Sequence, residues 1–420
     1  MLGWELPPTN SGGLGTASLG LTQGLSPLDI DIDFVLPEIH GSLPFDHMRV
    51  HSATKYTRDG ELESWENSLY SRSLGYGNYA VTTVDGTAVR ATAEMPLPAD
   101  TLPTPFGQAM WYAKRAARIA STHQFDIIHT HDWMTYQAGI AARSVASRRG
   151  DSAPFVAHVH ATEVDRGGSH GNPAISLLEK QGLQAADRVV AVSHYTKQTV
   201  HREYDVPLSN ISVVHNGINT SVPIPSFPLH ALKRHHKLVL FMGRITMQKG
   251  PEYFLELARR VTTVDPSVRF LMVGSGDLEK ACIERSAAMG LTGRVLFSSF
   301  LRGQDVNRAY QMADLFVMPS VSEPFGLVAL EAFQNGTPVI ASKQSGVAEV
   351  SQNLVTVDFW DMEVMTKTVL NLLANPHQGA ELVAAGKRDL HHLSWDRAAA
   401  QVVEIYHSLL PSSPSFSPAT

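Results

Sequence analysis

The second half of the chain alternates short apolar runs with longer amphipathic segments, and this alternation constrains the fold most strongly. Runs of about five apolar residues fit strands buried on both faces, and segments of about ten or more residues with helical spacing fit the helices that cover them. The pattern therefore predicts a parallel sheet with helices on both sides. Strands are expected at 238–243, 270–274, 295–300, 315–320 and 338–342, and helices at 251–261, 278–290, 305–313 and 326–336.

The first half repeats this alternation less regularly. Strands are expected at 30–36, 125–131, 155–161, 188–193 and 211–217, and helices at 16–25, 106–123, 134–150 and 175–186. Residues 42–100 carry no pattern that assigns them an element. The proline-rich segment 220–237 separates the two halves, so the fold class expected is α/β with two Rossmann-like domains that face each other.

The chain length supports the same division. A single core stops growing at about 250–300 residues, and this chain has 420. We expect an N-terminal domain at 1–222, a second domain at 223–395, a helix at 396–410 and a disordered Ser/Pro-rich tail at 411–420.

Composition excludes several classes of function. The net charge of -6 indicates no concentrated basic face, so no nucleic-acid partner is expected. One cysteine, Cys282, excludes an intramolecular disulfide and favours a reducing, cytoplasmic location. No apolar run approaches the ~18 residues of a membrane span, so no transmembrane segment is expected, although peripheral membrane association stays open. The oligomeric state stays unknown.

Candidate ligand residues lie where strands meet helices, because open parallel sheets bind ligands beyond the carboxyl ends of their strands. After strand 315–320, the opening turn of a helix exposes backbone N–H groups that suit a phosphate. Two carboxylates flank this turn and suit hydroxyl groups, although both could simply be solvated surface charges. The residues concerned are Glu323, Phe325, Gly326, Leu327, Val328 and Glu331.

Two further junctions carry suitable chemistry. Arg244 and Lys249 follow strand 238–243 and could neutralise a diphosphate, or could form a basic loop open to solvent. Gly12 and Gly13 lie in the glycine-rich segment 11–15, whose backbone N–H groups could face a ligand.

Together these motifs resemble the family 4 glycosyltransferases, the group that includes glycogen and sucrose-phosphate synthases. The resemblance rests on the glutamate pair Glu323 and Glu331, on Arg244 followed by Lys249, and on the glycine segment 11–15. It implies the B-type glycosyltransferase fold, with the active site in the cleft between the two domains and with the C-terminal helix at 396–410 crossing back to the N-terminal domain.

The resemblance also implies a function and residue roles. It implies a retaining transfer of a hexosyl group, preferably glucosyl, from a UDP-, ADP- or GDP-hexose to a sugar, glucan or other hydroxyl acceptor, without cofactor or metal. Arg244 and Lys249 would hold the diphosphate and Glu331 the ribose. Glu323, with the backbone of Phe325 and Gly326, would hold the donor sugar beside His160. Asp132 and Trp133 would lie on the acceptor side, unless the Trp133 ring is simply packed.

Other functions fit parts of the sequence. A metal-dependent hydrolase could use His129, His131, His158 and His160, whose spacing can ligate zinc, although these histidines could equally be part of the scaffold. A non-catalytic nucleotide-sugar-binding protein is a second alternative. A nicotinamide enzyme fits less well, because segment 274–279 lacks the third glycine of the dinucleotide fingerprint.

Overall fold

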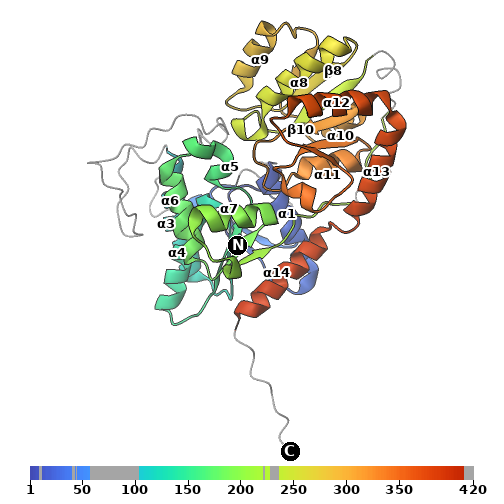
Figure 1. The fold of residues 1–420 in the computed structure, drawn as a ribbon. Helices are drawn as coiled ribbons and strands as arrows, with labels where there is room; N and C mark the ends of the chain where they lie inside the picture. Colours follow the sequence, from blue (N-terminus) through green and yellow to red (C-terminus); the bar gives the residue numbers. More distant parts are fainter. Residues whose placement is uncertain are drawn as a thin grey trace, which may run out of the picture.

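Two parallel sheets organise the chain, one in each half (Figure 1). The computed structural model describes residues 1–8, 12–39, 43, 45–56, 104–220, 223–227 and 236–410. The predicted tail at 411–420, residue 11 of the glycine segment, parts of the linker and most of 42–100 lie outside the described residues.

In the second half the described strands form a six-stranded sheet in the order β12-β11-β10-β7-β8-β9. All neighbouring strands are parallel, as predicted. The order reverses between β7 and β10, so a crevice opens beyond the carboxyl ends of these two strands. The strands are β7 (Leu238–Met242), β8 (Arg269–Val273), β9 (Val295–Ser298), β10 (Leu315–Met318), β11 (Val339–Ser342) and β12 (Val355–Val357).

Helices cover both faces of this sheet, because successive side chains of a strand point to opposite sides. Phe241 and Val239 pack in the cluster that includes residues of α8, α9 and α12, whereas Leu240 packs in the cluster of α10 and α11. The helices therefore exclude water from both faces of this sheet. The helices are α8 (Pro251–Val264), α9 (Glu279–Ala288), α10 (Gln304–Met312), α11 (Leu327–Gln334), α12 (Met362–Ala374) and α13 (Pro376–Leu390).

In the first half the described strands β3-β4-β5-β6 form a parallel sheet, and β1 pairs with β2. Leu2 bridges Val35 of β1 and Thr130 of β3, so residues 1–3 connect these strands into one layer. The strands are β1 (Asp33–Leu36), β2 (Arg49–Ser52), β3 (Ile128–His131), β4 (Phe155–Val159), β5 (Arg188–Ala191) and β6 (Ile211–Val213).

The first sheet is also covered on both sides. Phe155 and Ala157 pack against residues of α3, α4 and α6, whereas Val156 packs on the side of α1 and α14. The helices are α1 (Gly13–Leu25), α3 (Pro105–Thr122), α4 (Trp133–Arg148), α5 (Glu163–Gly167), α6 (Pro173–Ala185), α7 (His194–Tyr204) and α14 (Trp395–Leu409).

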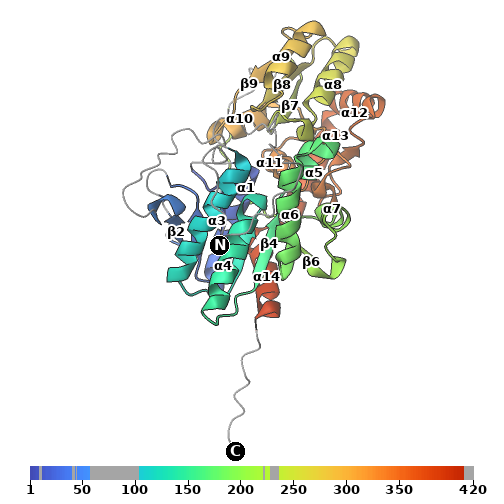
Figure 2. The same cartoon turned by 90° about the vertical axis from the view of Figure 1, so that its left-hand side faces the viewer.

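The last helix, α14, belongs to the first half in space although it follows the second half in sequence. Figures 1 and 2 show α13 on the second half and α14 running beside the first sheet. Ala399 and Val402 of α14 are buried in the same cluster as Leu21 and Leu25 of α1. The close contact between α1 and α14 requires a glycine at position 20, because a Cβ on Gly20 would lie 2.1 Å from the Trp395 ring.

The structure adds elements that the sequence analysis does not predict, namely β2, α5, α7, β12, α12 and α13. The helix α7 shows why such elements are missed in the sequence. Its residues are strongly polar on average, and its buried residues include Thr196 and Thr199, so the helix carries little apolar periodicity. The helix α5 is too short to show a period. The thiol of Cys282 is buried in α9, which agrees with an apolar role.

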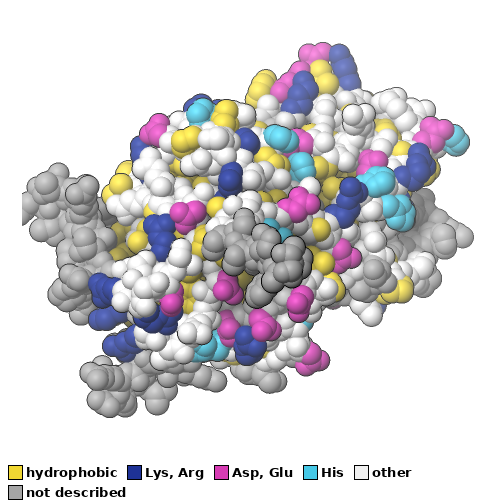
Figure 3. All heavy atoms as spheres, turned by 90° about the horizontal axis from the view of Figure 1, so that it is seen from below, with side chains coloured by type: hydrophobic (Ala, Val, Ile, Leu, Met, Phe, Trp, Pro, Cys, Tyr) yellow, Lys and Arg dark blue, Asp and Glu magenta, His cyan; other side chains and the backbone are white. Residues whose placement is uncertain are grey.

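The surface carries mixed charge. On the face shown in Figure 3, Lys and Arg side chains are interspersed with Asp and Glu. Among the described residues, no helix combines the length and apolar character that crossing a membrane requires.

We predict that Gly20→Ala destabilises the protein by about 1–3 kcal/mol, although alanine is the better helix former, because the new methyl group overlaps the Trp395 ring. Gly13→Ala is the matched control in the same helix, since nothing lies within 4 Å of a Cβ there. Urea denaturation of both variants measures the difference. Equal stability of the two variants would contradict the packing described for α1 and α14.

Candidate active site

The opening of α11 has the geometry expected for an anion site. Gly326 is its N-cap residue and has φ +105°, a conformation that favours glycine. A Cβ at this position would lie 3.1 Å from Met318 Cε and 3.2 Å from Glu323 Cγ. No side chain caps the helix, so its first N–H groups remain available.

Glu323 lies in the loop before this turn and contacts a lysine from a different junction. Its Oε2 atom lies 2.5 Å from Lys249 Nζ and accepts a hydrogen bond from Ser320 Oγ at 3.1 Å. The residue is only 5% exposed. Its backbone N–H donates to the Gln344 carbonyl at 2.8 Å, and its carbonyl accepts from Gly346 N at 2.9 Å. The structure therefore brings Lys249 and Glu323 together.

Arg244 and Lys249 lie in the connection from β7 to α8. This connection packs tightly against the loop after β8: a Cβ at Gly274 would lie 1.9 Å from the Gly243 carbonyl oxygen. The N–H of Ile245 donates to the Ser275 carbonyl at 2.9 Å, which fixes the backbone beside Arg244. The guanidinium of Arg244 makes a long contact of 3.4 Å with Gln248 Oε1.

Glu331 lies further along α11 with a partner that sequence patterns do not identify. Tyr310 of α10 donates its hydroxyl to Glu331 Oε2 at 3.0 Å, and the same hydroxyl lies 3.1 Å from the Val328 carbonyl. Burial raises the pKa of the Glu331 carboxyl. Glu331 and Tyr310 thus form a polar pair at the edge of the α11 turn.

In the first half, Asp132 and His160 follow β3 and β4. The Asp132 carboxylate accepts from His160 N at 2.7 Å and lies 3.2 Å from the Arg166 guanidinium. Asp132 has φ +61°, which is strained for a residue with a side chain. His160 Nε2 lies 3.0 Å from His131 Nδ1, and burial lowers the pKa of His160. Asp132 therefore positions the backbone that carries His160.

Trp133, which was predicted on the acceptor side, is buried, whereas Gly13 of the glycine segment is exposed. Trp133 is only 1% exposed and packs in the core of the first half, so its ring cannot stack on a sugar in this conformation. The structure therefore agrees with the alternative in which the Trp133 ring is simply packed in the core. Gly12 is the N-cap of α1, and a Cβ there would lie 2.8 Å from Glu5 Oε2. Gly13 is exposed.

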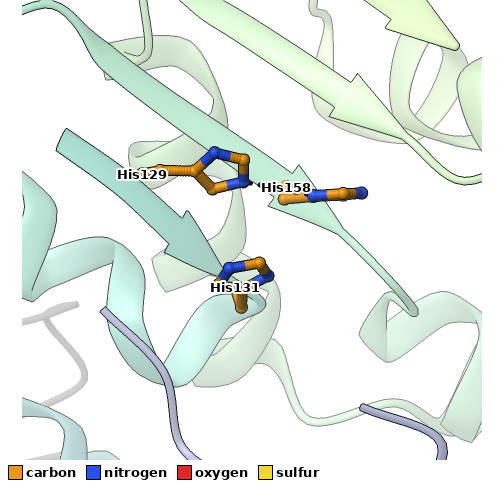
Figure 4. Close-up of side chains that lie close together, drawn as sticks. All are labelled: His129, His131 and His158. Atoms are coloured by element: carbon orange, nitrogen blue, oxygen red, sulfur yellow. Dashed lines mark hydrogen bonds between the residues drawn. The ribbon is translucent and has the colours of Figure 1, made fainter. Parts of the chain in front are cut away.

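The histidines of β3 and β4 form a buried stack (Figure 4). His129 and His131 come from β3 and His158 from β4, and the rings of His129 and His131 lie 4.7 Å apart with planes only 20° apart. His129 Nε2 lies 3.1 Å from His158 Nδ1, and His129 Nδ1 lies 2.5 Å from the Tyr406 hydroxyl of α14. Burial holds the pKa of all three well below its ordinary value, so the rings are neutral.

This stack fits a scaffold better than a metal site. One nitrogen of each of the three rings lies within 4.8 Å of the others, so the cluster has metal-ligating atoms. However, both nitrogens of His129 already have partners, and zinc ligands converge on the ion rather than stack face to face. The interpretation as scaffold histidines therefore accounts for more contacts than the hydrolase alternative.

The helix α5, which the sequence analysis does not predict, lies in the first half and contacts the second half. Thr162 caps it in a capping box with Asp165, a pattern readable in the sequence as Thr-x-x-Asp. The carboxylate of Asp165 also accepts from Ser322 Oγ at 2.5 Å, next to Glu323. The chain after His160 thus contacts the loop that holds Glu323.

A cavity of about 250 Å³ is lined by residues of both halves, among them residues of α5. Arg244 lines it, whereas Lys249, Glu323 and His160 do not. Of the residues that line this cavity, the sequence analysis named only Arg244 as a candidate. The lining residues are Glu163, Arg166, Gly167, His170, Gly171, Asn172, Pro173 and Ile175 from the first half, and Arg244, Thr246, Met247, Gln248 and Asp277 from the second.

Sequence comparison places both halves in known families. Residues 11–222 match the family described as Glycosyltransferase Family 4, and residues 227–389 match Glycosyl transferases group 1. An uncharacterized glycosyltransferase of Methanocaldococcus jannaschii is 26% identical, with 97% of each chain covered. The alpha-maltose-1-phosphate synthase of Mycolicibacterium smegmatis is 31% identical, covering 67% of this chain and 79% of its own.

Solved structures share the fold. Sucrose-phosphate synthase from Thermosynechococcus elongatus has a TM-score of 0.72 at 20% identity, covering 97% of this chain and 98% of its own. Anabaena HepE in complex with UDP and glucose has a TM-score of 0.69 at 18% identity, covering 97% and 99%. These likenesses confirm the B-type fold of two Rossmann-like domains expected from the sequence.

We predict that the protein loses stability as the pH falls below about 6.5, because the unfolded chain then takes up protons that the buried histidines exclude. Above that pH the contribution is fully present. The loss amounts to at most about 1.4 kcal/mol per histidine per pH unit. Urea midpoints between pH 5.5 and 7.5 measure it.

The matched comparison uses His158→Gln and the exposed His377→Gln. The first removes one buried titrating group and should flatten the pH dependence, whereas the second should leave it unchanged. A pH dependence that His158→Gln leaves intact would contradict the assignment of these protons.

Proposed function

Since the chain belongs to glycosyltransferase family 4 and is therefore an enzyme of the glycosyltransferase type, we propose that its donor is a nucleoside-diphosphate hexose. The transferred group is a hexosyl group, preferably glucosyl, and the acceptor is a hydroxyl of a sugar, glucan or other molecule. The anomeric configuration is retained.

The observation that carries this proposal is the meeting of Lys249 and Glu323 at the uncapped opening of α11. An ammonium group and free helix N–H groups suit a diphosphate, and the carboxylate suits sugar hydroxyls. The two side chains form an ion pair, so a donor that binds here replaces their contact with contacts to its own phosphate and hydroxyl groups.

The proposed chemistry follows from charge that develops on the leaving group. As the glycosidic bond to the diphosphate breaks, negative charge gathers on the phosphate, and Lys249, Arg244 and the α11 N–H groups stabilise it. His160, on the opposite half, would lie beside the sugar. Glu331 with Tyr310 would accept hydroxyl hydrogen bonds of the ribose. Gly12 and Gly13 would complete the donor site.

Ligands bound to solved structures of the same fold suggest which nucleotides to test first. Anabaena HepE binds UDP and glucose, which supports a uridine nucleotide and a glucosyl donor as the first pair to test. The catalytic domain of starch synthase IV from Arabidopsis thaliana binds ADP and acarbose, so an adenine nucleotide is the second. A thermal-shift screen of UDP-, ADP- and GDP-hexoses, followed by product analysis, tests the function directly. Absence of stabilisation by all of them would contradict it.

We predict that Lys249→Ala weakens donor binding and slows transfer by on the order of 10²-fold, because one cation at the diphosphate is lost. Kinetics with the donor found in the screen measure both effects. Lys343→Ala is the matched control, since Lys343 pairs with Asp358 at an exposed position. Near-normal rates for Lys249→Ala would remove this residue from the phosphate site.

We predict that Glu331→Ala chiefly reduces donor affinity, by about 10–100-fold, with a smaller effect on the maximal rate. Tyr310 retains the Val328 carbonyl as a hydrogen-bond partner, so the fold should tolerate the change. Calorimetric titration of the donor measures the affinity. The same titration with the nucleoside diphosphate alone, which keeps the ribose but lacks the hexosyl group, should show the same loss, because Glu331 is assigned to the ribose.

A further inference from the structure

The hydroxyl of Ser322 links the two halves of the molecule directly beside Glu323. It donates a hydrogen bond to Asp165 Oδ1 of α5 at 2.5 Å, and it lies 2.9 Å from the hydroxyl of Tyr195 in α7. Both partners belong to the first half, whereas Ser322 belongs to the loop after β10. Ser322 is 8% exposed and Asp165 is 3% exposed, so the surrounding protein shields this contact from water.

These three groups form one directed chain of hydrogen bonds. The Ser322 hydroxyl has a single proton and donates it to the Asp165 carboxylate, so the Tyr195 hydroxyl donates to Ser322. The other oxygen of Asp165, Oδ2, accepts from the backbone N–H and the hydroxyl of Thr162, at 2.7 and 2.8 Å. A buried carboxylate needs donors for both of its oxygens, and Asp165 receives the donor for Oδ1 from the opposite half.

The backbone at Ser322 is also bound within the second half, to the segment that carries Lys249. The N–H of Val321 donates to the Gln248 carbonyl at 2.9 Å, and the N–H of Ser322 lies 3.4 Å from the same oxygen. Gln248 directly precedes Lys249, whose ammonium group contacts the Glu323 carboxylate. Ser322 therefore lies where the contacts from the first half meet the two charged residues of the candidate donor site.

The proposed function requires the Glu323 carboxylate to change partners while its backbone stays in place. The carboxylate leaves Lys249 and accepts hydrogen bonds from sugar hydroxyls, and its new position is accurate only if the loop does not move with it. Ser322 restrains the loop on one side of Glu323. Pro324 restrains it on the other side, because its carbonyl accepts from the Ser193 hydroxyl of the first half at 2.6 Å.

We propose that Ser322 is a positioning residue for the transfer reaction, held by Asp165 and Tyr195 of the first half so that the Glu323 carboxylate meets the donor sugar in one orientation. The inference rests on the proposed function, from which it takes the role of Glu323. It goes beyond that function because it makes the first half set the donor-sugar site through a loop contact. The restraint acts on the sugar, since the diphosphate is assigned to Lys249 and the α11 N–H groups.

The experiment compares Ser322→Ala with the unaltered protein, using the donor found in the screen. Alanine removes the hydroxyl and leaves the Thr162 contacts of Asp165 in place. We expect kcat/KM for the donor to fall about 10–100-fold, because a small displacement of a group that holds the substrate is costly in rate. The Kd of the nucleoside diphosphate alone should stay within about twofold, since Lys249 is unaltered. Ser408→Ala, at an exposed position of α14, is the matched control and should change neither value.

A double-mutant cycle separates positioning from a purely structural role. Glu323→Gln removes the charge that Ser322 is proposed to position, so adding Ser322→Ala to this variant should lower kcat/KM by less than about threefold. Tyr195→Phe removes the donor to Ser322 without altering the loop itself, and it should lower kcat/KM by about 3–10-fold. Tyr195→Phe also carries the test if Ser322→Ala does not fold.

The outcomes separate the two proposals. Failure of every nucleotide sugar to bind the unaltered protein would overturn the proposed function. A loss of activity in Glu323→Gln, with unchanged donor kinetics in Ser322→Ala and Tyr195→Phe, would overturn the positioning role alone. Equal losses of affinity for the donor and for the nucleoside diphosphate in Ser322→Ala would also overturn it, and so would independent effects of Ser322→Ala and Glu323→Gln, because either result leaves Ser322 a structural residue.

Discussion

The fixed position of the loop at 320–326 is the constraint on which the rest of the candidate site depends. Its backbone is bound from the second half by Gln344 and Gly346, and from the first half by the Ser193 hydroxyl, which donates to the Pro324 carbonyl at 2.6 Å. A Cβ at Gly346 would lie 2.2 Å from that same carbonyl oxygen. Because both halves hold one short loop, the α11 turn keeps its direction toward the cleft.

A second set of contacts, made by Glu349, links the two halves by charge. Glu349 of the second half accepts from the backbone N–H groups of His194 and Tyr195, at 2.8 and 2.7 Å, and lies 3.1 Å from His215 Nε2. These N–H groups open α7, so the carboxylate also meets the positive end of that helix. These contacts lower the pKa of Glu349 against the opposing effect of burial. The interface is thus polar and is held by directional hydrogen bonds.

Much of the fold follows from sequence because buried parallel strands leave an uninterrupted apolar signal. The position of Lys249 beside Glu323 was expected only through the family resemblance, because the sequence alone does not show that β7 and β10 are neighbouring strands. The role of Tyr310 does not follow, because a tyrosine in an amphipathic helix gives no sign of its hydroxyl partner. Trp133 was ambiguous for a related reason: exposure cannot be read from residue type.

The position of α14 has a consequence for synthesis of the chain. Its buried side chains complete the apolar layer over α1, and the Tyr406 hydroxyl is the partner of His129. During translation the first half therefore emerges with one flank uncovered, and that flank stays open until the final helix is made. The second half, whose sheet is assembled from residues 238–357, can fold in the interval. The first domain made is then the last to be finished.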